Sequence, residues 1–153
     1  MMERAPCKIL AVLGGLGTLV HAEHTAELAC HLCEGRNADL VLGYPIIVPL
    51  ASALDADLPN QERAARDAIE RGLNAANQRG CRATTRIFSH RDPADAILEL
   101  ARTERADVIV LGIHVNPNVP RDYDRAETAE DEILRRAECE VIVDREPLVI
   151  SDL

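Results

Sequence analysis

Residues 107–111, Asp-Val-Ile-Val-Leu, followed by Gly112, carry the clearest secondary-structure signal in this chain of 153 residues. Four consecutive apolar residues lack the alternation of a half-exposed strand, and the run is too short for a typical helix. Such a run is typical of a strand that is covered on both faces, as in a parallel sheet. We expect the strand to end at Gly112.

Strand and helix patterns alternate along the rest of the chain. Further strands are expected at residues 7–13, 40–44, 83–88 and 140–143. Helices are expected at residues 20–34, 59–79 and 93–104, and after Thr128, where a fourth helix carries Ile133, Leu134 and Ala137. Residues 45–58 and 113–126 are expected to be loops. The order β-α-β-α-β-α-β-α-β predicts a single domain, residues 1–153, of the α/β class: a three-layer, doubly wound, five-stranded parallel sheet.

Two helix starts have a local chemical cause. Asp92 is an expected N-cap, Pro93 suits the first helical position, and the carboxylate of Asp95 favours the positive end of the helix dipole. Thr128 and Asp131 form a near capping box for the last helix.

Composition excludes several classes of partner. The chain has 26 acidic and 17 basic residues, a formal charge of −9, which repels nucleic acid and anionic membrane surfaces. Aromatic residues make up only 2%, too few for a base-stacking platform. The longest uncharged run, residues 40–54, is too short to span a membrane, and the start of the chain lacks a signal-peptide pattern. Five scattered cysteines do not resemble a disulfide framework. We therefore expect a cytoplasmic protein with free thiols and no membrane insertion.

Ligands of doubly wound folds bind beyond the carboxyl ends of the strands, where the strand order reverses. Gly14, Gly15 and Gly17 follow the first strand, and they are interpreted either as a phosphate-binding turn or as a tight strand-to-helix connection. They do not form the dinucleotide fingerprint, because the third glycine position is Val20. His114 follows the fourth strand, where it would contact a ligand or remain an exposed loop histidine.

A metal site is not expected. On a helix, His21 and His24 point away from Cys30 and Cys33, so the four side chains cannot converge on one ion. The pair Cys30 and Cys33 lies near a helix end, whereas redox pairs lie at helix starts. No second pair of ligands is expected to face these cysteines, so we expect neither a disulfide nor a zinc ion.

Three stretches carry a resemblance to a known family: residues 91–97 (RDPADAI), 106–112 (ADVIVLG) and 133–143 (ILRRAECEVIV). Together with Lys8-Ile9-Leu10, they resemble the universal stress protein family over roughly residues 7–145. The resemblance implies an adenine nucleotide alpha hydrolase-like fold, a homodimer and a cytoplasmic role in the stress response. Fold alone does not imply a reaction.

One branch of that family binds ATP through Gly-x2-Gly-x9-Gly-Ser/Thr after the fourth strand and an Asp after the first. Gly112 matches the first glycine and Thr128 keeps the hydroxyl. Val115 replaces the second glycine, Glu127 places a carboxylate where phosphate would lie, and Gly14 replaces the Asp. The resemblance therefore implies a noncatalytic regulatory or binding module with no cofactor.

Two other hypotheses stay open. His114 and Arg121 would rebuild a phosphate clamp, which would make the protein a slowly hydrolysing ATPase that binds ATP and Mg²⁺ through a remodelled loop. Residues 50–59 resemble a segment of stress-type domains that are associated with membrane transporters, which would make a transporter the protein partner.

Overall fold

The computed structural model describes residues 7–15, 22–113 and 128–145. Its strands are β1 (Cys7–Val12), β2 (Ala38–Ile47), β3 (Ala83–His90), β4 (Val108–Ile113) and β5 (Glu140–Arg145). Its helices are α1 (Ala22–Arg36), α2 (Pro59–Gln78), α3 (Pro93–Glu104) and α4 (Ala129–Arg136). The alternating order predicted from the sequence is confirmed. None of the helices in these ranges is long and apolar enough to cross a membrane.

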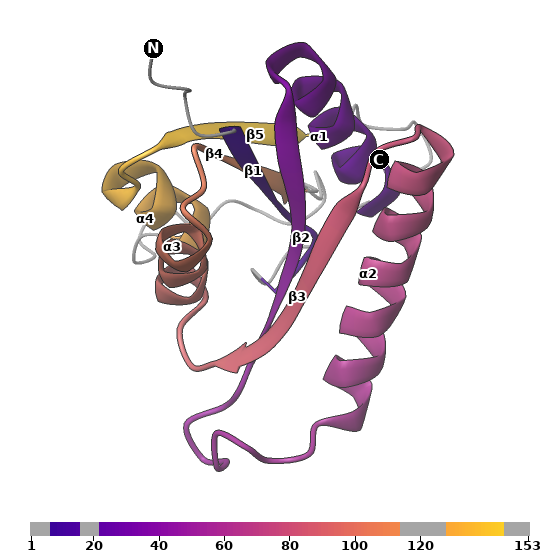
Figure 1. Ribbon diagram of the computed structural model, residues 1–153. Helices are drawn as coiled ribbons and strands as arrows, with labels where there is room; N and C mark the ends of the chain where they lie inside the picture. The colour runs from indigo at the N-terminus through magenta and orange to yellow at the C-terminus, as the bar shows by residue number, and fades with distance from the viewer. Residues whose placement is uncertain (1–6, 16–21, 114–127, 146–153) are drawn as a thin grey trace, which may run out of the picture.

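The five strands form one parallel sheet in the order β3-β2-β1-β4-β5. Figure 1 shows α1 and α2 on one face of the sheet and α3 and α4 on the other. The chain runs outward from β1 to β3, then returns to place β4 on the other side of β1. The predicted three-layer, doubly wound fold is therefore confirmed, and its switch point lies between β1 and β4.

Two apolar cores fill the spaces between the layers. Ile9 and Ala11 of β1 point into the core under α1 and α2, whereas Leu10 and Val12 point into the core under α3 and α4. These four residues are completely buried. The continuous apolar run of β1 follows directly, because successive side chains of a strand point to opposite faces.

The two predicted helix caps are confirmed. The Asp92 carboxylate accepts a hydrogen bond of 2.8 Å from the backbone N–H of Asp95, with Pro93 at the start of α3. The Thr128 hydroxyl accepts one of 3.1 Å from the N–H of Asp131. Each bond satisfies an N–H group that has no partner within the helix.

The predicted ends of all five strands differ from the observed ones: β1 ends one residue earlier, at Val12, and β3 and β5 extend to His90 and Arg145. The ends of β2 and β4 have a structural explanation. β2 continues through Pro45 to Ile47, residues that the sequence assigned to a loop. The carbonyl oxygen of Gly43 points toward β1 and accepts a hydrogen bond from the N–H of Leu13. Backbone groups two residues apart on a strand point to the same side, so the nitrogen of Pro45 also faces the β1 side. It lies beyond the last residue of β2 that pairs with β1. The missing N–H of Pro45 therefore interrupts no pairing with β3. Similarly, Gly112 does not end β4, because β5 pairs with it and with Ile113.

Two predicted helix faces also need correction. The helical periodicity of residues 20–34 predicts that Thr25, Leu28, Ala29 and Leu32 share one face of α1. In the structure Leu28 and Leu32 are only partly buried, whereas Cys30 and Cys33 are buried. On α4, Ile133 is buried but the side chain of Leu134 is 50% exposed, and the helix ends before Ala137. In both helices, tertiary packing selects a slightly rotated face.

The thiols of α1 have a neighbour that the sequence did not reveal. Cys81, between α2 and β3, interacts with both Cys30 and Cys33. Burial is the main cause that raises the pKa of both buried thiols to about 12, and the interaction with Cys81 raises them further. Cys81 is a single additional thiol and not the second pair of ligands that a zinc site would need. None of the five cysteines, all of which lie in the described part of the chain, forms a disulfide bond.

We predict that Cys30 and Cys33 resist alkylation in the native state. A pKa raised from 9.0 to about 12 lowers the thiolate fraction at pH 8 about a thousandfold, and the thiolate is the reactive form. Mass spectrometry after timed iodoacetamide treatment measures the rate at each cysteine. The control is the same protein in urea without reductant, where all five thiols should react. Native rates equal to the unfolded rates, or two thiols missing in urea, would contradict the prediction.

Candidate functional site

The carboxyl edge of the sheet at the switch point brings several of the predicted site residues together. Val12 of β1 pairs with Leu111 of β4, so Gly14 and Gly15 follow one strand beside Gly112 of its neighbour. Thr128 lies at the start of α4. Other predicted site residues lie outside the described residues: Gly17, His114, Val115, Arg121 and Glu127.

Gly14 has no side chain because an aromatic ring occupies the space. A Cβ atom built on Gly14 would overlap the ring of Tyr44, with its Cζ only 2.9 Å away. Tyr44 lies on β2, and burial raises the pKa of its hydroxyl, so the ring stays neutral in this position. An Asp at position 14 would have to displace this ring.

The backbone conformation at position 15 requires a glycine. Its φ angle is +84°, a conformation that L side chains rarely adopt, and a Cβ atom there would collide with the carbonyl oxygen of Pro45. The extension of β2 beyond Gly43 thus lies directly against the turn after β1. This packing favours the tight strand-to-helix connection over the phosphate-binding turn for the first two glycines.

The sequence did not predict the buried carboxylate at this edge. Asp144 of β5 pairs in register with Gly112 and is only 7% exposed. Its Oδ2 accepts a hydrogen bond of 2.9 Å from the hydroxyl of Thr25 and lies 2.9 Å from Nδ1 of His24. These contacts connect α1 to β5. The only sequence signal was an acidic residue directly after the apolar run 141–143.

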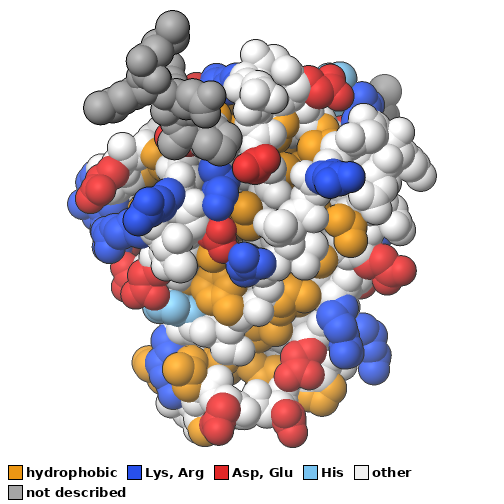
Figure 2. All heavy atoms as spheres, in the orientation of Figure 1, with side chains coloured by type: hydrophobic (Ala, Val, Ile, Leu, Met, Phe, Trp, Pro, Cys, Tyr) orange, Lys and Arg blue, Asp and Glu red, His pale blue; other side chains and the backbone are white. Residues whose placement is uncertain are grey.

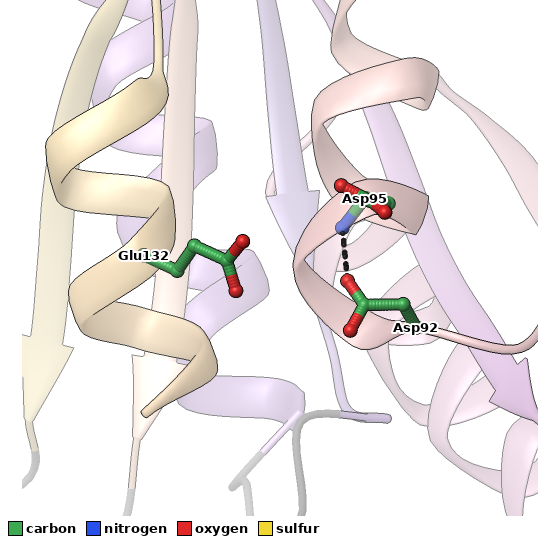
Figure 3. A group of neighbouring side chains, drawn as sticks. All are labelled: Asp92, Asp95 and Glu132. Carbon is green, nitrogen blue, oxygen red and sulfur yellow. Dashed lines mark hydrogen bonds between the residues drawn. The ribbon is translucent and has the colours of Figure 1, made fainter. Parts of the chain in front are cut away.

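Three carboxylates on the α3–α4 side lie close enough to suggest a cation site. Figure 3 shows Glu132 of α4 pointing toward Asp92 and Asp95 at the start of α3. Asp92 already caps α3, and Arg136 lies 2.8 Å from Asp95 and 2.6 Å from Glu132. The cluster is therefore explained as an ion-pair network that joins the two helices, and we assign no metal to it.

Doubly wound proteins with a switch-point crevice form a broad class of small-ligand-binding folds. Residues 8–145 of this chain match the universal stress protein family, and the chain belongs to that family. No curated protein has a matching sequence.

Solved structures show the same fold. A universal stress protein family member from Burkholderia pseudomallei is 23% identical, with a TM-score of 0.64 over 89% of this chain and 93% of that one. The Archaeoglobus fulgidus universal stress protein in complex with dAMP is 14% identical, with a TM-score of 0.62 over 91% and 97%. An Arabidopsis thaliana family member with AMP bound is 15% identical, with a TM-score of 0.59 over 93% of each chain.

We predict that Gly14→Ala lowers the free energy of unfolding by about 1–3 kcal/mol, because its methyl group overlaps the Tyr44 ring. In a Tyr44→Ala background the same substitution should cost at least about 1 kcal/mol less. Urea unfolding of the four proteins measures this coupling. The matched control is Gly35→Ala on α1, where a Cβ atom meets nothing within 4 Å and stability should hold or rise. Equal costs of Gly14→Ala in both backgrounds would show that the ring is not the cause.

Proposed function

We propose that this protein is a homodimeric regulatory module of the stress response that does not bind ATP in the usual mode of its family and has no catalytic activity. The packing of the Tyr44 ring on Gly14 carries the proposal. In the nucleotide-binding branch, a carboxylate follows the first strand at this position. Here the space for that side chain is filled by β2.

The charge at the same edge supports the proposal. Asp144 is buried beside Gly112, the glycine that matches the start of the ATP motif. A carboxylate there opposes the approach of a triphosphate, since charges interact more strongly away from bulk water. Glu127 would add a second carboxylate just before α4, where the helix dipole otherwise favours an anion.

A second candidate function is an ATP-binding protein with slow ATPase activity. Solved relatives in complex with cAMP, dAMP and AMP favour it. Thr128 keeps its hydroxyl at the start of α4, although that hydroxyl already accepts from Asp131. His114 and Arg121 would have to supply the phosphate contacts in place of the missing glycines.

We propose that the module acts through a protein partner in the cytoplasm, and that a membrane transporter is a candidate. The segment between β2 and α2 presents an exposed apolar tip, with Leu50 88% exposed and Leu54 49% exposed. Arg91 holds this segment by donating to the carbonyls of Pro49 and Ser52, each at 2.9 Å. Figure 2 shows apolar side chains gathered on the lower half of the face, where Figure 1 places β2, β3 and this segment.

We predict that Mg-ATP binds weakly or not at all. Each lost charged contact removes about 1.5–3 kcal/mol, so several losses turn micromolar affinity into millimolar. Isothermal calorimetry measures the dissociation constant of the purified chain. The variant Val115→Gly with Glu127→Gly should bind Mg-ATP more tightly, because it supplies both glycines and removes the carboxylate, although eleven residues rather than nine separate the two positions. A low-micromolar constant for the unmodified chain, or ATP retained through purification, would favour the ATP-binding alternative.

We predict a homodimer in which the exposed edge of β5 is covered. An unpaired edge is prone to unwanted pairing, and twofold dimers are the commonest way to close it. Light scattering at micromolar concentration should give a mass near twice 16.7 kDa. Val143, which is 40% exposed on β5, offers a test: Val143→Lys should shift the mass toward the monomer. A monomeric unmodified chain under these conditions would overturn the prediction.

A further inference from the structure

A cavity of about 320 Å³ lies between α3 and α4, far along β4 from the carboxyl edge. It is bordered by the last turns of both helices and by the amino ends of β4 and β5: Leu98, Ala101, Arg102, Arg105, Ala106, Ile109, Arg136, Ala137, Glu138 and Cys139. Its volume is at the lower end of the range for small-molecule sites. None of its lining residues belongs to the candidate site described above.

The floor of the cavity is apolar and continuous with the protein core. Leu98, Ala101 and Ile109 are at most 8% exposed, and Ile109 is completely buried. Ala106 and Cys139 are partly buried and pack against the same core. Burial raises the pKa of the Cys139 thiol, which therefore stays neutral and adds to the apolar surface. A floor made of core residues is rigid, so the cavity is formed before any ligand arrives.

Two arginines at the rim have no ion-pair or hydrogen-bond partner for their side chains among the described residues. Within residues 7–15, 22–113 and 128–145, neither Arg102 nor Arg105 makes an ion pair or a side-chain hydrogen bond. Arg136 also lines the cavity, but it is already paired with Asp95 and Glu132. Both side chains are exposed, so their guanidinium groups are available to a ligand in the cavity. Each can donate two parallel hydrogen bonds to a carboxylate or a phosphate.

The backbone at the rim adds a second observation. Arg105 caps the end of α3 with φ 56° and ψ 46°, the left-handed conformation that usually selects glycine. An arginine there costs about 1 kcal/mol of backbone strain. The backbone N–H of Arg105 donates to the carbonyl of Arg102, and that of Ala106 donates to the carbonyl of Ala101. These bonds hold the backbone of Arg105 in place. This helix-ending turn sets where the exposed side chain of Arg105 leaves the backbone, at the rim of the cavity.

We propose that this cavity binds a small organic anion that carries one carboxylate or phosphate on a short apolar body. The anionic group lies between Arg102 and Arg105, and the apolar body lies against Leu98, Ile109 and Cys139. Glu138 at the same rim disfavours ligands with a cationic group. The site is independent of nucleotide binding at the carboxyl edge, so it stands whether or not Mg-ATP binds there.

The test is a titration of the ¹⁵N-labelled full chain with hexanoate, followed by NMR. Amide shifts should change at residues 98–109 and 136–139, whereas the neutral amide hexanamide should bind at least about tenfold more weakly. Inorganic phosphate, which has charge but no apolar body, should also bind about tenfold more weakly than hexanoate. Equal binding of hexanoate and either control, shifts that map to the carboxyl edge, or no shifts would overturn the proposal.

Two sets of substitutions test the charged rim and the apolar interior of the cavity separately. Arg102→Gln with Arg105→Gln should weaken hexanoate binding at least about tenfold. The matched control removes two exposed arginines of α2 on the other face of the sheet, Arg63→Gln with Arg66→Gln, and should leave binding unchanged. Ala106→Leu fills the cavity while keeping both arginines, so it should abolish binding. Unchanged binding in either cavity variant, or equal weakening in the α2 control, would show that the anion binds elsewhere or only through net charge.

Discussion

The burial of both faces of β1 is the constraint on which the rest of the structure depends. Every side chain from Ile9 to Val12 is completely buried, and β2 and β4 occupy both backbone edges of the strand. A strand that is apolar on both faces needs a helical layer on each side. The chain must therefore send α1 and α2 to one face and α3 and α4 to the other. The switch point between β1 and β4 is a direct consequence of this division.

The same close packing determines the chemistry of the carboxyl edge. β2 extends past its last β1 pair, so Tyr44 and Pro45 press against the turn that leaves β1. Glycine is required at position 15 by its positive φ angle, and any side chain at position 14 would have to displace the Tyr44 ring. The buried Asp144 then makes the neighbouring end of β5 acidic. Packing and charge at this edge are the basis of the proposal that ATP does not bind in the usual mode.

The two ends of the sheet differ in charge. The carboxyl edge contains a buried carboxylate, whereas Arg102 and Arg105, at the cavity near the amino ends of β4 and β5, have no partner in the part of the chain that the structure describes. Both ends depend on the same core, because Ile109 and Leu111 of β4 belong to one apolar cluster.

The sequence by itself determined the order of the elements, the parallel sheet and the helix starts at Asp92 and Thr128, because these depend on local patterns of burial and capping. It also placed Gly14 after the first strand and Gly112 on the fourth, and indicated which positions of the ATP motif lack glycine. Only the tertiary structure decided that Tyr44 fills the space beside Gly14, that Asp144 meets Thr25 and that Cys81 meets the thiols of α1. The cavity beside Arg102 and Arg105 belongs to this second group. These contacts join residues that are distant along the chain. Local patterns in the sequence do not indicate which of these side chains meet when the layers pack together.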